Sequence, residues 1–278
     1  MLERIFNFLI QISSQSDPIN VIKEAQEYCV GLVKNFDPDR YLITLAAPKN
    51  TQAALIVLFA FNVEIERILN TVSEETLGRI KLQWWREGLE SVFNGKPRKH
   101  MVLIALKSIL DKFPICHSTL EEIIDAQEQA LEKQGLKSFH QLYNHGQRTG
   151  GNLFKLSAGF IKCNAQLGLE LGTIFALVQL MKSIKVDQLK GRCYLPSIQL
   201  NEIESAKAVN VYKTTLNEIL KCLPKISSDS SSFSKICYWI VSYDLRFLNE
   251  KQSIFYEDRE WHLGWRKCLI AMRIFALR

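Results

Sequence analysis

Residues 172–196 read GTIFALVQLMKSIKVDQLKGRCYLP, and the rest of the chain is organised around this stretch. Polar residues recur at every fourth position in its first part, at Gln179, Ser183 and Asp187. This spacing stacks the three side chains on one face of a helix. Because the other residues of the helix are strongly apolar, we expect the polar stripe to lie inside the protein. It either lines a cavity or makes buried hydrogen bonds.

The composition indicates a protein with a sizeable core and a modest positive charge. Hydrophobic residues make up 47% of the 278 residues, and the formal net charge is +6. This surplus fits a solvated, lysine-rich surface, or attraction to an anion such as diphosphate or a lipid headgroup. We expect no nucleic-acid partner, because no dense basic and aromatic block occurs. The seven scattered cysteines and five histidines show neither disulfide nor zinc-ligand spacing.

Almost every segment has the pattern of a helix. Glycine and proline are few, and no Asn-Gly turn separates alternating strands. Residues 51–70 are too apolar for a surface helix and predict a central core helix. Residues 138–163 predict a helix interrupted near its two adjacent glycines, and Ser118 with Glu121 forms a capping-box pattern. With no linker to divide the chain, we expect one all-α domain over residues 1–278.

The predicted core helix carries a second polar stripe, with Asn62, Glu66 and Asn70 at every fourth position. Two facing helices with such stripes would build a polar chamber in the middle of a helical bundle. Satisfied buried polar groups without any ligand remain the alternative. Basic residues lie near the stripes in sequence or on adjacent turns: Arg148, Lys182, Lys185, Lys190 and Arg192.

Both stripes lie in segments that resemble known motifs. LFAFNVEIERILN, residues 58–70, is similar to the segment with the first aspartate-rich motif of squalene and phytoene synthases. Residues 172–196 resemble the segment with the second motif, including its Gly-Arg-x-Tyr-Leu-Pro end. DRYLITLAAPKN and LQWWREGLE also fit, so the resemblance covers about residues 37–196. It implies an all-α, isoprenoid-synthase-type bundle around a central cavity.

The resemblance also implies which residues face the cavity, although the metal motifs have changed. In that family, aspartates of both motifs hold magnesium ions that bridge the substrate diphosphates. Here one carboxylate remains at each motif, Glu66 and Asp187, which is too few for several ions. We therefore expect no cofactor, and Mg²⁺ only if condensation persists. The candidates for direct phosphate binding are Arg148, Arg192, Lys182 and Lys185, and the candidate cavity aromatics are Tyr41, Trp85 and Tyr194.

Residues 61–67 and the stretch LGRIKLQWWRE resemble one branch of the family more closely. This branch contains a mitochondrial respiratory complex I assembly factor and its bacterial relatives. The resemblance implies a non-catalytic pseudoenzyme that binds a lipid or isoprenoid, or that helps to assemble respiratory complex I. The alternative is an active prenyltransferase that condenses prenyl diphosphates head to head in isoprenoid biosynthesis.

The sequence favours a cytoplasmic protein with peripheral attachment to a bacterial inner membrane. Its longest apolar run, residues 53–61, has nine residues, against ~20 for a membrane-spanning helix. Two end segments are candidate membrane contacts, MLERIFNFLI at residues 1–10 and WHLGWRKCLIAMRIFALR at residues 261–278. A basic amphipathic helix can lie on an anionic membrane. A bundle helix with a basic outer face fits the second segment equally well.

Overall fold

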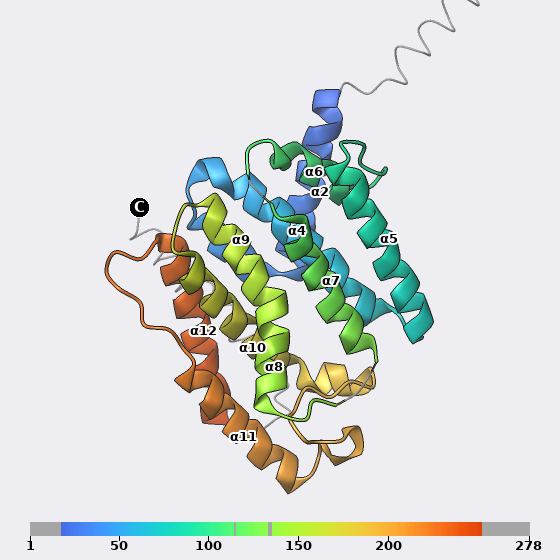
Figure 1. Cartoon of the computed structure of the whole chain (residues 1–278). Helices are drawn as coiled ribbons and strands as arrows, with labels where there is room; N and C mark the ends of the chain where they lie inside the picture. The colour runs from blue at the N-terminus through green and yellow to red at the C-terminus, as the bar shows by residue number, and fades with distance from the viewer. Residues whose placement is uncertain (1–17, 114, 133–134, 252–278) are drawn as a thin grey trace, which may run out of the picture.

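The computed structural model describes residues 18–113, 115–132 and 135–251 (Figure 1). Every long element in these ranges is a helix, which confirms the predicted all-α class. The two candidate membrane contacts, residues 1–10 and 261–278, and a last helix expected near residues 258–277 lie outside the described residues.

The described helices run in chain order with short connections. They are α2 (Pro18–Phe36), α3 (Pro38–Leu45), α4 (Lys49–Thr71), α5 (Glu75–Phe93), α6 (Met101–Leu110), α7 (His117–Leu131), α8 (Phe139–Gly146), the π-helix η1 (Gln147–Gly151), α9 (Asn152–Phe160), α10 (Ala165–Leu189), the 3₁₀-helix η2 (Leu200–Glu202), α11 (Ala206–Lys221) and α12 (Ser232–Lys251).

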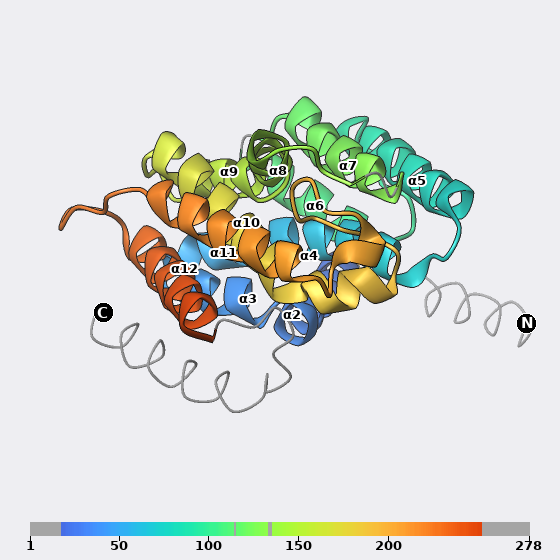
Figure 2. The same cartoon turned by 90° about the horizontal axis from the view of Figure 1, so that it is seen from below.

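Helices α4 and α10 form the interior of the bundle. Figure 2 shows α2, α3 and α12 on one side of them and α5, α7, α8 and α9 on the other. The residues of α4 from Ala54 to Val63 are all buried, as the apolar run predicted. Among the described helices, only α10 is long and apolar enough to cross a bilayer, but 61% of its apolar window is buried inside the fold. This burial is typical of the core helix of a helical bundle.

The interruption predicted near Gly150 and Gly151 is confirmed, and it takes the form of η1 between α8 and α9. The glycines allow η1 to pack directly against α10. A Cβ atom added to Gly172 would lie 2.2 Å from the Gly150 carbonyl oxygen, and one added to Gly150 would lie 2.5 Å from the Gly172 carbonyl oxygen. The two backbones therefore touch at a place where no side chain fits.

The capping box predicted at Ser118 is wrong. Helix α7 begins at His117, and its N-cap is Cys116, which makes no side-chain capping bond. The Ser118 hydroxyl lies 3.0 Å from the Cys116 sulfur instead. Because the helix begins at His117, Ser118 lies within its first turn rather than at the N-cap position that a capping box requires.

We expect Gly172→Ala to lower the free energy of unfolding by about 2–3 kcal/mol, because the new methyl group overlaps backbone rather than a movable side chain. Gly159→Ala is the matched control, since a Cβ atom at Gly159 meets nothing within 4 Å. There alanine should stabilise the helix by about 0.5–1 kcal/mol. Urea unfolding followed by circular dichroism measures both values. Equal effects of the two substitutions would contradict the contact between η1 and α10.

Candidate functional site

A cavity of about 280 Å³ lies where the ends of α4 and α10 face each other. Five of the six stripe residues line it: Glu66, Asn70, Gln179, Ser183 and Asp187. Asn62 is fully buried behind them, and its side-chain amide donates a 2.8 Å hydrogen bond to Glu66 Oε1. The structure therefore brings the two stripes together around one chamber.

Asp187 is buried, and both of its carboxylate oxygens accept hydrogen bonds from the protein. Ser183 Oγ donates to Oδ2 at 2.5 Å, and Arg192 donates to Oδ1 from Nη2 at 2.7 Å and from Nε at 3.3 Å. Arg192 is also buried, and its Nη1 donates to the Leu69 carbonyl oxygen at 2.7 Å. This ion pair joins the end of α10 to the end of α4. It leaves Asp187 engaged on both oxygens.

Two cationic side chains, Lys190 and Arg192, lie at the C-terminal end of the first stripe, next to Asn70. Asn70 Oδ1 accepts a 2.8 Å hydrogen bond from Lys190 Nζ and a 3.1 Å bond from Arg192 Nη2. Burial lowers the pKa of Lys190, and the nearby Arg192 guanidinium lowers it further. The neutral amide of Asn70 thus accepts hydrogen bonds from two cationic side chains.

A second arginine, Arg40, lies in the cavity wall and was not among the predicted site residues. Its side chain is 4% exposed, and its Nη1 donates to Asp37 Oδ2 at 2.6 Å. Its Nη2 lies 3.7 Å from Glu66 Oε1, and its Nε has no hydrogen-bond partner among the described residues. A buried N–H without an acceptor is costly, so a ligand oxygen would stabilise it. Glu66 has a raised pKa because the surrounding protein removes water, although Arg40 opposes this effect.

The remaining wall is aromatic and uncharged. Phe175 lies under the Arg40 guanidinium, with 4.9 Å between the Arg40 Cζ atom and the ring centre. The rings of His145 and Tyr194 stack with 5.8 Å between their centres. Burial, and then the charge of Arg148, lowers the pKa of His145 to about 4, so this imidazole is neutral near pH 7. Tyr194 was predicted from the sequence, whereas His145 and Phe175 were not.

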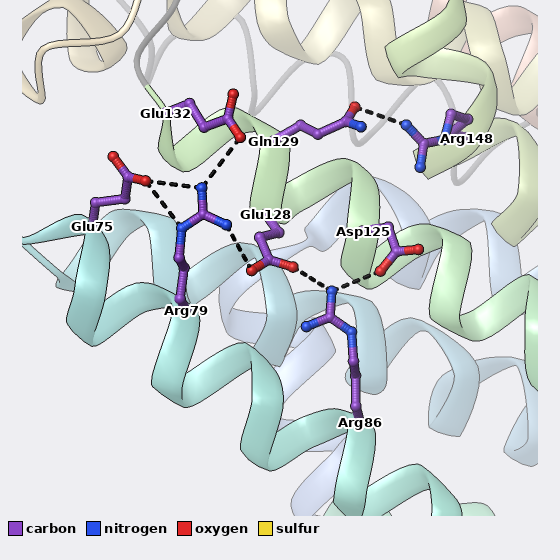
Figure 3. A network of polar contacts seen from close by, with 8 residues as sticks. All are labelled: Glu75, Arg79, Arg86, Asp125, Glu128, Gln129, Glu132 and Arg148. Atoms are coloured by element: carbon purple, nitrogen blue, oxygen red, sulfur yellow. Dashed lines mark hydrogen bonds and ion pairs between the residues drawn. The ribbon is translucent and has the colours of Figure 1, made fainter.

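Arg148 does not line the cavity, although the sequence named it as a phosphate ligand. Its Nη1 donates a 2.8 Å hydrogen bond to Gln129 Oε1 on α7. Figure 3 shows this pair beside a network in which Arg79 and Arg86 of α5 reach carboxylates on α7. Position 148 lies in η1, whose wider turn changes the direction of each side chain from that of an α-helix.

Four other predicted residues also lie outside the cavity lining. Lys182 lies 3.0 Å from Asp244 Oδ2 and 3.5 Å from Asp39 Oδ2, so it links α10 to α12 and α3. Lys185 lines a separate surface pocket beside Leu189. Tyr41 packs against the apolar core, and Trp85 lines a groove between α4 and α5. Of the four predicted phosphate ligands, Arg192 alone is in the cavity lining.

Comparison with known proteins gives the family. The model of the squalene/phytoene synthase family matches residues 33–221. The chain belongs to the squalene/phytoene synthase family. This result confirms the resemblance found in the two stripes.

Known proteins that resemble the chain match between about half and two thirds of it. The NADH dehydrogenase (ubiquinone) complex I assembly factor 6 of Mus musculus is 32% identical over 130 residues, 47% of this chain and 39% of that protein. Phytoene synthase 1 of Zea mays is 22% identical over 193 residues, 66% of this chain and 47% of that protein. The chain thus spans less than half the length of these two relatives.

Solved structures of squalene/phytoene synthase relatives show the same fold. A dehydrosqualene synthase in complex with a ligand superposes with a TM-score of 0.74 at 14% identity, covering 94% of this chain and 98% of the other. Squalene synthase HpnC from Alicyclobacillus acidocaldarius gives a TM-score of 0.66 at 14% identity, covering 85% and 98%. The predicted isoprenoid-synthase bundle is therefore confirmed.

The cavity side chains do not fit the magnesium centre of synthases in this family. Magnesium prefers accessible, anionic oxygen ligands in near-octahedral geometry. Both Asp187 oxygens are engaged, and Glu66 accepts from Asn62 and faces Arg40. Within the described ranges, no three His, Cys, Asp or Glu side chains are placed to hold one ion. Arg40, Lys190 and Arg192 offset the charge of the three carboxylates in the lining, Asp37, Glu66 and Asp187, and so weaken its attraction for a metal ion.

We expect Arg192→Ala to destabilise the fold by about 3–5 kcal/mol, since it leaves the Asp187 carboxylate buried without its counter-ion. The double variant Asp187→Asn/Arg192→Met should recover most of this loss. Lys207→Ala is the control, because Lys207 pairs with Glu202 on the exposed surface and should cost under about 1 kcal/mol. Urea unfolding of the four proteins measures these differences. A loss for Arg192→Ala as small as for Lys207→Ala would contradict a buried ion pair.

Proposed function

We propose that this family member binds a phosphorylated isoprenoid or lipid-like molecule without condensing it, and helps to assemble respiratory complex I. The main support for the absence of condensation is that Ser183 and Arg192 both donate hydrogen bonds to the Asp187 carboxylate. Condensation of prenyl diphosphates needs metal ions that stabilise the charge of the leaving diphosphate. An aspartate held by an arginine is a poor ligand for such ions.

The cavity chemistry supports an anionic headgroup attached to an apolar chain. Arg40, Lys190 and Arg192 supply fixed cations, and arginine offers the forked hydrogen bonds that suit phosphate oxygens. Part of the lining is apolar or aromatic and includes Leu69, Phe175, Ala176, Leu180, Val186 and Tyr194.

The size of the cavity also supports binding over condensation. Its volume of about 280 Å³ lies just below the range for small-molecule sites, about 300–1,000 Å³. This space suits one headgroup and the first part of its chain. Two prenyl diphosphates side by side would need considerably more room.

The assembly role is supported by the mammalian relatives, which are named as assembly factor 6 of complex I. In this proposal the chain works beside respiratory complex subunits at a membrane, on the cytoplasmic side of a bacterial inner membrane. The ligand in the cavity would then serve recognition or delivery rather than synthesis.

Farnesyl and geranylgeranyl diphosphate with Mg²⁺ should release no pyrophosphate in the presence of the pure protein. An organic extract of the purified chain should contain an isoprenoid or lipid, measured by mass spectrometry. Arg40→Met should reduce this content several-fold because it removes the fixed cation beside Glu66. Lys207→Met on the exposed surface should not change it. Magnesium-dependent pyrophosphate release from these substrates would instead establish the prenyltransferase alternative.

Deletion of the gene should lower the content of assembled respiratory complex I in the source cells. Native gel electrophoresis with in-gel NADH oxidation measures this content, and the gene supplied in trans should restore it. Unchanged complex I content in the deletion strain would contradict the assembly role.

A further inference from the structure

The outer face of α5 exposes a stripe of large apolar side chains. Leu77, Ile80 and Trp84 are 44%, 61% and 37% exposed, at positions i, i+3 and i+7 of one helix. Met101, at the start of α6, is exposed as well. Helices normally bury residues with this spacing against a core. A contiguous exposed apolar stripe indicates a surface that meets something else.

Basic side chains surround this stripe. Lys81 lies on α5 between Ile80 and Trp84, and the Arg98 guanidinium lies over the Trp84 ring at 5.7 Å. Lys99 is exposed in the loop that leads to α6. Arg98 pairs with Glu87, whereas Lys81 and Lys99 make no ion pair with any described residue. The face therefore carries a net positive charge beside its apolar stripe.

A groove of about 240 Å³ opens beside the stripe, between α4 and α5. Arg67, Thr71, Lys81 and Trp84 line it. The one carboxylate in the lining, Glu64, accepts a 2.9 Å hydrogen bond from Tyr28 and lies 3.8 Å from Arg67. Its charge is thus partly satisfied within the protein. Two cations and a hydroxyl group at the groove suit a phosphodiester headgroup.

We propose that this α5 face, defined by Leu77, Ile80, Lys81, Trp84 and Lys99, docks on an anionic phospholipid bilayer. Leucine, isoleucine and tryptophan enter the interfacial region of the bilayer, where the amphipathic indole ring is favoured. The lysines and arginines bind headgroup phosphates, each adding to the attraction of a negative leaflet. The positive charge around an apolar stripe is what identifies an anionic bilayer as the occupant.

The position of α5 in the fold gives a clean control surface. Figure 1 shows α5 on one flank of the bundle, with α11 and α12 on the opposite flank. The end of α11 carries an exposed aliphatic residue followed by a lysine, Leu220 and Lys221, as α5 does at Ile80 and Lys81. Substitutions of Leu220 and Lys221 therefore serve as matched controls, because they change the same kinds of side chain outside the α5 face. The docking surface is also separate from the central cavity, so its failure would leave the proposed function untouched.

The test is co-sedimentation of the full chain with vesicles of phosphatidylglycerol and phosphatidylcholine, and with vesicles of phosphatidylcholine alone. We expect binding to the anionic vesicles and little to the neutral ones. Ile80→Glu and Lys81→Glu should each weaken binding about tenfold, whereas Leu220→Glu and Lys221→Glu should leave it unchanged. Circular dichroism confirms that each variant keeps its helical fold, since all four positions are exposed.

Several results would overturn the proposal. Absence of binding to anionic vesicles is one, and equal weakening by the α5 and α11 variants is another. Binding that persists unchanged in Ile80→Glu and Lys81→Glu would assign the contact to another part of the chain. Sedimentation velocity adds a last criterion: a dimer that Ile80→Glu dissociates would make this face a contact between two copies instead.

Discussion

The ion pair between Asp187 and Arg192 is the interaction on which the site depends. Gly191 adopts a φ angle of +75°, a left-handed conformation that glycine adopts without strain. The chain turns back there, and the Arg192 backbone N–H donates to the Asp187 carbonyl oxygen at 2.9 Å. This turn places the Arg192 guanidinium between the Asp187 carboxylate and the end of α4. Arg192 therefore caps the end of α10, links α10 to α4 and pairs with the one carboxylate that remains in the second motif.

This arrangement keeps the architecture of the squalene/phytoene synthases and changes the electrostatics of the cavity. A magnesium centre depends on several carboxylates whose oxygens are free to coordinate. Here three cationic side chains, Arg40, Lys190 and Arg192, line the cavity beside its carboxylates Asp37, Glu66 and Asp187. Arginine side chains can bind phosphate oxygens. They do not recruit the metal ions that stabilise a leaving diphosphate. The proposed binding without condensation rests on this difference in the side chains that line the cavity.

The sequence was sufficient to predict the central helices and their facing stripes, because a four-residue spacing fixes the face of a long helix. It also predicted the interruption at Gly150, since adjacent glycines inside a helix imply close backbone contact. It did not identify Arg40 or His145, which reach the cavity from α3 and α8, two short helices whose orientation depends on tertiary packing.

Long basic side chains were the least predictable part of the site. Arg148 and Lys182 lie near the motifs in sequence, yet each is turned toward partners on a neighbouring helix. Their direction depends on where Gln129 and Asp244 lie, and no local pattern encodes that. A signal for Arg40 was present in the Asp37-Pro38 helix start, where an N-cap aspartate pairs with the residue three positions later.

Binding of inorganic pyrophosphate, measured by isothermal titration calorimetry with Mg²⁺ and with a chelator, most directly tests whether cationic side chains of the cavity hold an anion. If arginine and lysine hold the anion, pyrophosphate should bind in the presence of the chelator, and the dissociation constant measured there should rise in Arg40→Met. Binding that requires Mg²⁺ and disappears in Asp187→Asn would contradict the account, because Asp187 would then act as a metal ligand.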